Sequence, residues 1–309
     1  MKLCTKCKFE IVNKDESWCK NCKKEYLKFY RENNKEKIKT LNQNWRSSNK
    51  EYNKEMKYNY YCSLKGRIVE INRSAKRRSK NKNIEFDLDV LFLENLWNSQ
   101  NGNCKITNLP LEINNKRNNG KPSPFSPSLD RICCDKGYTK DNVRFVCYMV
   151  NCGLHDYGIS VFDRIAKAYI CNEIIDYNDN YRFIEPKSKK SISNKKYAES
   201  FKGTLNTLFN QCKKHANEKM EFNISKAHIE NMLQKNVCSI TNIPFCYKLY
   251  GDKRSNPFRP SVDRINSDIG YTNNNTRIVC VAVNYFLNEF GEDNLRKVCH
   301  SYINNYLKS

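Results

Sequence analysis

The sequence predicts an α+β protein in which a small cysteine-rich unit and a long basic helix precede two tandem copies of a strand–strand–helix (ββα) unit. Three observations support this prediction. Two Cys-x-x-Cys pairs lie near the start, the segment after them is basic and lacks Pro and Gly, and most of the remaining chain repeats itself. The expected domains are residues 1–25, 26–60, 61–185 and 201–309, with a linker at 186–200.

The first unit contains the pairs Cys4-x-x-Cys7 and Cys19-x-x-Cys22. Two residues between thiols allow both sulfurs to reach one tetrahedral ion. Four thiolates leave no open coordination position, so we expect a zinc knuckle with one structural Zn²⁺ that supplies most of the folding free energy of this short unit. The alternative interpretation is a redox-active or coincidental cysteine cluster.

From about Lys23 to Asn59 the pattern predicts one long, very polar helix with aromatic side chains between its lysines. Such a helix cannot be held by a core of its own. It is either a solvated linker or an arm that lies along phosphates. The basic run resumes after residue 75, which favours the arm. The residues predicted to bind DNA in this second run are Lys76, Arg77, Arg78 and Lys80.

The rest of the chain occurs twice. The matching segments are Leu64–Ile68 with Phe201–Leu205, Ile84–Leu88 with Met220–Ile224, Cys104–Leu111 with Cys238–Phe245, and Ser123–Asn151 with Asn256–Asn284. From Asp130 to Asn151, 13 of 22 positions are identical in the second copy, whereas average composition would give about one or two. The offset between copies falls gradually from 137 to 133 residues. This pattern indicates a duplication followed by small loop changes.

Each copy is expected to contain the same elements. Alternating apolar residues and turn signals predict two short strands joined by a turn at Gly137-Tyr138, followed by a helix that carries Asn151. The polar segment at 185–196 reads as a surface linker. The expected strands are 129–132 and 143–147, and the expected flanking helices are 89–100, 161–175, 226–234 and 293–306.

The overall charge favours a polyanionic partner. The 309 residues include 55 Lys and Arg against 33 Asp and Glu, a formal net charge of +22, and nucleic acid is the commonest partner of so basic a chain. A compositional bias toward Lys is the alternative explanation. No stretch reaches the ~18 apolar residues of a membrane span, and the start has no hydrophobic signal core. We therefore expect an intracellular protein, neither secreted nor membrane-bound, whose 16 cysteines are reduced.

The run D-R-x5-G-Y-x3-N-x-R-x-V-C-x3-N, present in both copies, resembles the HNH or ββα-metal (His-Me finger) endonucleases. The upstream Cys-x-x-Thr-Asn-x-Pro segment and the N-terminal knuckle strengthen this resemblance. It is closest to PacI-like restriction enzymes and more distant to phage and intron-type homing endonucleases, and it covers residues 1–25 and both repeats. The resemblance implies a metal-dependent DNA endonuclease.

Hydrolysis of a phosphodiester needs a cation on the scissile phosphate, a base for the water and a positive group for the developing charge. An aspartate on the first strand and an asparagine on the following helix offer two oxygen ligands, which suits Mg²⁺ or Mn²⁺. The arginines beside the aspartates are expected to contact phosphate. The predicted cation ligands are Asp130 and Asn151, then Asp263 and Asn284, and the predicted phosphate contacts are Arg131 and Arg264.

Most HNH sites place a histidine beside the metal-binding residue, where this chain has Arg131 and Arg264. The resemblance to PacI-like enzymes implies that Tyr138 and Tyr271 act as the base instead. Ionising a phenol at pH 7 costs about 4 kcal/mol, but a divalent cation and a neighbouring arginine both favour the phenolate. The tyrosine could also be a covalent nucleophile, or an aromatic packed under the hairpin.

Other repeated residues are expected to be structural. Asn142 and Asn275 should hydrogen-bond the turn to the second strand. The pairs Cys104 with Cys147 and Cys238 with Cys280 resemble remnants of a second zinc site of PacI-like proteins. Two thiolates seldom hold zinc alone, so we expect these sites to be apolar and without metal. His155 is either a third metal ligand in the first copy or an ordinary helix residue, since the second copy has Asn288. The remaining ligand positions of the thiol sites hold Thr107, Val150, Thr241 and Val283.

The sequence thus predicts a monomeric pseudo-dimer whose two sites address the two strands of double-stranded DNA. Double-strand cleavage of the homing or restriction type is the favoured activity. Resolution of junctions or branched DNA is a close alternative. A non-catalytic DNA-binding protein built on the same fold and an RNA-binding zinc protein are rivals from other classes.

Overall fold

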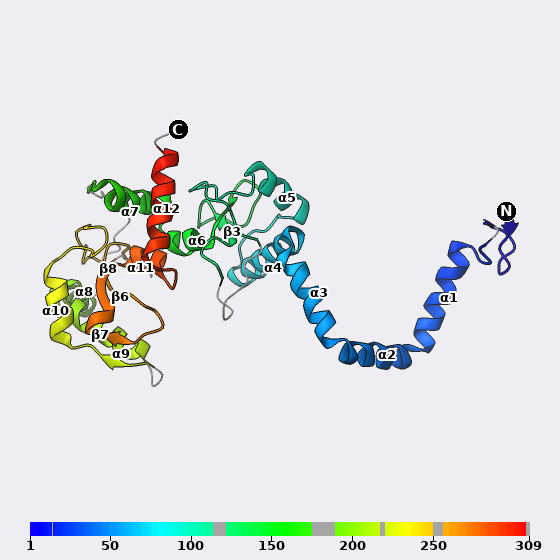
Figure 1. Ribbon diagram of the computed structural model, residues 1–309, viewed down its shortest axis with the longest axis horizontal. Coiled ribbons are helices and arrows are strands. Elements are labelled where there is room, and N and C mark those ends of the chain that lie inside the picture. The colour runs from blue at the N-terminus through cyan, green and yellow to red at the C-terminus, as the bar shows by residue number, and fades with distance from the viewer. Residues whose placement is uncertain (14, 114–121, 175–188, 217–219, 250–255, 307–309) are drawn as a thin grey trace. The chain divides into compact units, whose positions relative to one another are not determined.

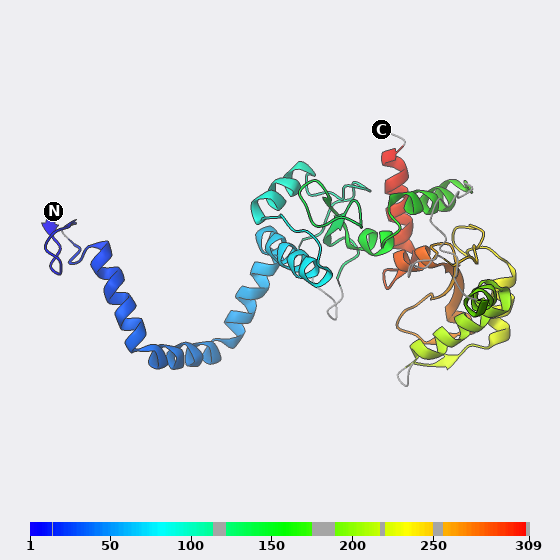
Figure 2. The ribbon, with the colours of Figure 1, turned by 180° about the vertical axis from the view of Figure 1, so that it is seen from behind.

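The computed structural model describes residues 1–13, 15–113, 122–174, 189–216, 220–249 and 256–306, in two compact units, Met1–Tyr61 and Cys62–Ser309 (Figures 1 and 2). Helices predominate, and each sheet that the described residues form has two strands. The predicted α+β class is therefore confirmed as a mixed helix-and-sheet protein. The family expected for its repeats stays a prediction.

The first unit begins with a small antiparallel hairpin of β1 (Lys2–Leu3) and β2 (Ile11–Val12). Helix α1 (Lys20–Asn33) follows, and Cys19 caps its N-terminus by accepting the backbone N–H of Cys22 at 3.4 Å. The buried side chains here are Val12 and three of the four cysteines, with Trp18 packed against them. A core this small leaves the sulfurs as the main organising groups.

The prediction of a single long helix after the knuckle is wrong. The segment forms α1, α2 (Lys35–Ser48) and α3 (Lys50–Cys62), and neither α2 nor α3 has a buried residue. The helix breaks at Asn34 and Asn49, whose backbone angles leave the helical region. Each asparagine donates its side-chain N–H to a carbonyl four residues earlier, at 2.9 and 2.8 Å. Asparagine side chains that bond the local backbone in this way compete with helix continuation.

The two breaks share a local sequence. Tyr30-Arg31 precedes Asn34-Lys35-Glu36, and 15 residues later Trp45-Arg46 precedes Asn49-Lys50-Glu51. The shared pattern of an aromatic, an arginine and an Asn-Lys-Glu run therefore marks each junction between helices.

The second unit contains both repeats, and their elements correspond. The first repeat has α4 (Leu64–Lys82), α5 (Val90–Ser99), β3 (Pro127–Arg131), β4 (Val143–Cys147), α6 (Tyr148–Leu154), α7 (Ile159–Ala166) and a π-helical turn η2 (Lys167–Cys171). The second has α9 (Phe201–Ala216), β5 (Phe222–Asn223), α10 (Lys226–Gln234), β6 (Pro260–Arg264), β7 (Tyr271–Thr272), a 3-10 turn η3 (Asn273–Asn275), β8 (Thr276–Cys280), α11 (Val281–Leu287) and α12 (Gly291–Tyr306). The expected strands and helices of the repeats are confirmed to within a few residues, except that the helix expected at 161–175 ends at Cys171, and residue 175 lies outside the described residues.

The duplicated sequence gives duplicated local contacts. Ser63 and Ser200 each accept a backbone N–H three residues ahead, both at 3.1 Å, and so begin α4 and α9 in the same way. In each hairpin the strands pair antiparallel in the same register, β3 with β4 and β6 with β8. The first strand therefore presents its aspartate opposite an arginine in both copies.

Helix α8 (Lys189–Glu199) occupies most of the predicted linker at 186–200. Residues 186–188 lie outside the described residues. The Glu199 carboxylate accepts the backbone N–H of Leu249 at 2.8 Å, and the carbonyl of Ala198 accepts from the Arg259 guanidinium at 3.2 Å. These partners lie 50 to 61 residues downstream, so a polar local composition gave no sign of them.

The sequence predicted that the glycine of the Gly-Tyr pair lies at the centre of a turn, and this prediction is wrong. The glycine lies where a second segment passes close to the hairpin. Tyr138 bridges to Phe86, and Tyr271 in β7 pairs parallel with Phe222 in β5. A Cβ on Gly137 would lie 2.4 Å from the carbonyl oxygen of Glu85. Glycine is therefore required for this close backbone approach.

The two repeats pack against each other through α6 and α11 (Figures 1 and 2). Gly153 in α6 and Phe286 in α11 occupy equivalent positions of the two copies and face each other: a Cβ on Gly153 would lie 2.1 Å from the Phe286 ring. The ring is fully buried and stacks on Phe162 with centroids 4.9 Å apart. The duplicated helices are thus matched as a small residue against a large one.

The closing helices strengthen this contact by crossing between repeats. The Tyr302 hydroxyl in α12 donates to Asp163 in α7 at 3.0 Å, and the Tyr169 hydroxyl in η2 donates to Glu292 at 2.8 Å. The Arg164 guanidinium lies over the Phe258 ring of the other repeat, 4.3 Å from its centroid. One continuous hydrophobic core consequently runs through both copies.

We predict that Gly153→Ala destabilises the protein by about 1–3 kcal/mol, because the added methyl overlaps a ring that buried neighbours hold in place. Urea unfolding measures this change. Combining Gly153→Ala with Phe286→Leu should recover part of the loss, because the smaller side chain makes room for the methyl. Strictly additive effects of the two substitutions would contradict direct packing between these positions.

Candidate functional site

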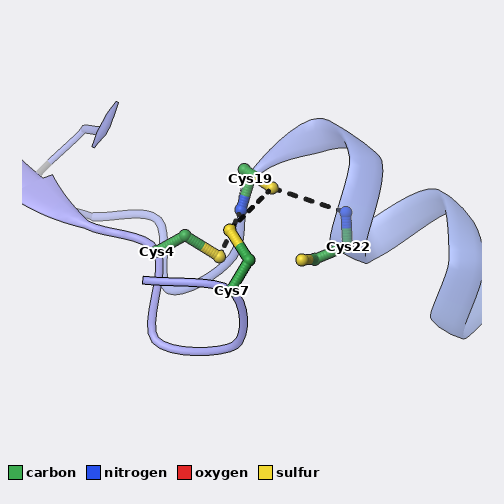
Figure 3. Close-up of side chains that lie close together, drawn as sticks. All are labelled: Cys4, Cys7, Cys19 and Cys22. Carbon is green, nitrogen blue, oxygen red and sulfur yellow. Dashed lines mark hydrogen bonds between the residues drawn. The ribbon is translucent and has the colours of Figure 1, made fainter. Parts of the chain in front are cut away.

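The four cysteines of the first unit converge, as predicted (Figure 3). Their sulfurs all lie within 4.8 Å of one another. The Cys7 and Cys19 sulfurs are 3.8 Å apart, and the backbone N–H of Cys19 donates to the Cys4 sulfur at 3.1 Å. Cys4, Cys7, Cys19 and Cys22 could therefore hold one metal ion such as zinc in tetrahedral coordination.

A bound cation would relieve an electrostatic conflict within the cluster. Burial would raise the pKa of Cys4, but backbone N–H groups of Cys7 and Cys19 donate to its sulfur and lower the pKa to about 6. Burial and the neighbouring sulfurs raise the pKa of Cys22 to about 12. Sulfurs packed this closely cannot all ionise beside one another, and a bound divalent cation removes that repulsion.

We predict that the purified chain contains one equivalent of zinc and that Cys22→Ser loses it. Strong chelators should also collapse the chemical-shift dispersion of the amide NMR signals of residues 1–25, because the metal supplies most of the folding free energy of this unit. Cys171→Ser is the matched control, since Cys171 is exposed and distant in sequence from the cluster. Retention of stoichiometric zinc by Cys22→Ser would contradict a four-thiolate site.

The predicted metal-binding aspartates are buried and paired with arginines on the neighbouring strand. Arg144 donates its Nε to Asp130 at 2.8 Å, and Arg277 donates to Asp263 at the same distance. Burial raises the pKa of both aspartates, and the facing arginine of each pair opposes that rise. Sequence reasoning missed these arginines as site residues, although the conserved spacing D-x13-R in both repeats contained them.

The predicted asparagine ligands are held in one orientation. The side-chain N–H₂ of Asn151 donates to the Ser128 hydroxyl at 2.6 Å and to the carbonyl of Leu129 at 3.3 Å. Asn284 makes the same two contacts in the second copy, with Ser261 and Val262. A carbonyl oxygen only accepts, so the group that faces it must be the amide nitrogen. The amide oxygen is thereby turned to the other side, where it can serve as a ligand.

The arginines that follow the aspartates lie over the predicted tyrosines. The guanidiniums of Arg131 and Arg264 each lie 5.3 Å from a ring centroid, that of Tyr138 and that of Tyr271. Both arginines also donate to turn carbonyls, at 2.7 Å to Lys136 and 2.8 Å to Ser267. The turn backbone therefore fixes these cations beside the phenol rings.

The tyrosines are only 7 and 6 % exposed, so they pack under the hairpin as well as facing the site. The Tyr138 hydroxyl accepts a hydrogen bond from the Nε of Arg78 in α4 at 2.9 Å. Burial raises the pKa of Tyr271, and Arg264 acts in the opposite direction. A phenolate at Tyr271 would therefore need additional positive charge.

Four predicted residues of the second repeat meet in one cavity of about 470 Å³. Asp263, Arg264, Tyr271 and Asn284 all line it. In the first repeat, Asn151 bonds the residues just before Asp130 in β3. In the second copy an acidic side chain, an amide, an arginine and a phenol thus line one cavity, and the first copy repeats the asparagine hydrogen bonds and the Arg–Tyr contact.

The two asparagines predicted to be structural bond the turn between the strands. Asn142 accepts the backbone N–H of Cys133 at 2.8 Å and donates to the carbonyls of Cys133 and Gly137. Asn275 accepts from Asn266 and donates to three carbonyls of the equivalent turn. These bonds hold the turn that carries the Arg–Tyr pair.

All four residues predicted to contact DNA are exposed on α4, namely Lys76, Arg77, Arg78 and Lys80. Arg78 differs from the others because it lies over the Tyr138 ring and bonds its hydroxyl. The basic surface of α4 therefore reaches the first hairpin site directly. The periodicity of the sequence did not indicate that contact.

The thiol pairs behind the hairpins are buried, with Thr107 or Thr241 beside them. A hydrogen bond from Cys147 lowers the pKa of Cys104 to about 6. Burial would raise the pKa of Cys238, but hydrogen bonds from Cys280 and Thr241 lower it to about 6. Val150 and Val283, at the remaining ligand positions, are also buried. Each pair therefore lies in a mostly apolar setting, as expected.

Within the described parts of the chain, the knuckle cysteines are the one group of three or more Cys, His, Asp and Glu side chains that converge like metal ligands. Each hairpin offers one carboxylate and one amide, so neither hairpin forms a group of three or more such side chains.

In the same described residues, every helix is too short or too polar to cross a membrane.

We predict that Arg144→Gln raises the pKa of the Asp130 carboxyl further. The substitution removes the positive charge that opposes the effect of burial, so protonation of Asp130 should extend to higher pH. Titration of the labelled carboxyl by NMR measures the shift. Arg277→Gln, the matched change in the other repeat, should leave Asp130 as it is. An unchanged or lowered pKa of Asp130 in Arg144→Gln would contradict this pairing.

Comparison with known proteins adds no relative: no family model, no curated protein and no solved structure matches this chain.

Proposed function

We propose that the chain is a metal-dependent DNA endonuclease of the HNH or ββα-metal type, with one hydrolytic site in each repeat. The observation that carries the proposal is the duplication of contacts as well as residues. Each hairpin pairs its aspartate with a cross-strand arginine, and each anchors its asparagine through the amide nitrogen. Packing alone would not require a buried carboxylate, a fixed amide and an arginine–phenol pair at both positions.

The donor atoms of each hairpin suit a hard divalent cation. Asp130 and Asn151, like Asp263 and Asn284, offer a carboxylate and an oriented amide oxygen, which Mg²⁺ and Mn²⁺ prefer to sulfur or nitrogen. Two protein ligands leave positions for phosphate oxygens and water. A cation bound there would supply positive charge on the scissile phosphate and lower the pKa of a bound water.

The chain's own groups have separate tasks in this scheme. Arg131 and Arg264 are fixed by turn carbonyls and can bond a phosphate oxygen as negative charge develops. Tyr138 and Tyr271 would accept the proton of the attacking water once positive charge has favoured their phenolate forms. The P–O bond to the water oxygen then forms as the bond to the leaving oxygen breaks, and the leaving oxygen takes up a proton from solvent. Burial raises the pKa of Tyr271, and the positive charge of Arg264 would favour the phenolate that this task needs.

Binding of double-stranded DNA would rest on the basic surfaces. The exposed basic residues of α4 reach the first site through Arg78. Helices α2 and α3 expose all of their lysines and all of their aromatics except the half-buried Tyr61, as a phosphate-tracking arm would. Contacts of this kind release counterions, so the affinity should fall steeply with salt.

We predict that the wild-type chain linearises supercoiled plasmid containing a cognate site in the presence of Mg²⁺. Asp130→Ala and Asp263→Ala should each yield nicked circles, with the rate at the altered site reduced at least about 100-fold, and the double variant should yield neither product. Agarose-gel time courses distinguish these forms. A library of plasmid inserts serves as substrate while the recognition sequence is unknown.

Asp135→Ala and Asp268→Ala are the matched controls, because they remove exposed aspartates from equivalent turns. Both should linearise plasmid like the wild type. Tight, salt-sensitive DNA binding by the wild type without cleavage in Mg²⁺ or Mn²⁺ would reject the nuclease and leave a DNA-binding protein. Preference for four-way junctions over linear duplex would identify the junction-resolving alternative.

A further inference from the structure

The cavity of the second repeat is built by both repeats. Besides Asp263, Arg264 and Asn284, it is lined by Cys152 and His155 from α6 and its C-terminal end in the first repeat. The sequence had assigned His155 to the first site or to none. The packing of α6 against α11 instead brings the imidazole to the other repeat.

His155 is held at this place by contacts with both repeats. Its ring stacks on Tyr285 of α11, with centroids 4.8 Å apart and planes 17° from parallel. Its Nδ1 lies 3.6 Å from the Asp156 carboxylate. The side chain is still 47 % exposed, so the ring can contact a ligand in the cavity. Stacking and exposure together fit a group that is pre-positioned for a substrate.

The duplication places different residues at the equivalent positions of the two repeats. Asn288 is the counterpart of His155, and Tyr285 is the counterpart of Cys152. Asn288 and Tyr285 also line the cavity of the second site. His215 in α9 is the counterpart of Arg78 in α4, and His215 also lines the cavity of the second site. The imidazoles of His155 and His215 therefore line the second site, whereas in the first site the Arg78 guanidinium lies over the Tyr138 ring.

We propose that the second site is composite: His155, supplied by the first repeat, contacts the backbone of the DNA strand that Asp263 and Asn284 process. This proposal rests on the proposed nuclease function. The chemistry of the cavity favours a phosphodiester, because His155, His215 and Arg264 offer N–H donors around the carboxylate of Asp263. His155 is a substrate-positioning residue for the second site and has no such role in the first.

The test uses single-site parents. Asp130→Ala leaves only the second site active, and Asp263→Ala leaves only the first. In the Asp130→Ala parent, His155→Asn should lower kcat/KM for nicking about tenfold, chiefly through KM, because the shorter asparagine side chain no longer reaches the charged phosphate with its N–H. In the Asp263→Ala parent, the same substitution should change nicking less than about twofold.

Asparagine is the matched replacement because the molecule already uses it at the counterpart position. His155 has φ 45° and ψ −125°, and Asn288 has φ 40° and ψ −119°. Asparagine therefore accepts this left-handed backbone. His300→Asn, an exposed histidine on α12 outside the cavity, controls for loss of an imidazole elsewhere. Thermal melting of every variant should stay within about 2 °C of its parent.

Four results would overturn the proposal. Loss of nicking only in the Asp263→Ala parent would return His155 to the first site. Equal loss in both parents would show a structural role at the interface between repeats. No loss in either parent would remove His155 from substrate contact. Absence of nicking by both parents before His155 is changed would reject the nuclease itself, and the composite site with it.

Discussion

The packing of α6 against α11 is the contact on which the rest of the second unit depends. Each of these helices carries the asparagine of one site, so their mutual position fixes both sites at once. The contact is asymmetric, with Gly153 in one helix opposite Phe286 in the other. Two phenylalanines would clash at this place and two glycines would leave a cavity. A duplicated chain can tolerate such divergence, whereas a homodimer of either repeat would need a self-complementary surface.

Within each hairpin the main electrostatic constraint is a buried carboxylate. Asp130 and Asp263 would be costly to bury as anions without partners, and the cross-strand arginines Arg144 and Arg277 compensate that cost. The pairing holds each carboxylate at the end of its strand, beside an amide that is already oriented. The proposed cation site is therefore assembled largely before any ligand binds, as precise catalytic geometry requires. The same feature accounts for the survival of the D-x13-R spacing in both copies.

Sequence patterns could predict the parts of the fold that depend on nearby residues. The strand 143–147 and the helix 226–234 have the expected bounds, and Asn142 bonds the turn beside it. The breaks in the arm arise from single asparagine side chains in an otherwise helical pattern, and α8 depends on partners far along the chain. The placement of His155 beside the second site was beyond prediction, because it follows from packing between repeats that no local periodicity encodes.

We propose that the two repeats act on opposite strands of one duplex. Cleavage mapping on a duplex labelled at both ends tests it most directly, with the Asp130→Ala and Asp263→Ala variants compared on the same cognate sequence. We expect each variant to make a single nick, the two nicks to lie on opposite strands, and one fixed stagger to separate them. Nicks on the same strand by both variants, or nicks on both strands by either one, would contradict two hydrolytic sites related by a pseudo-twofold axis.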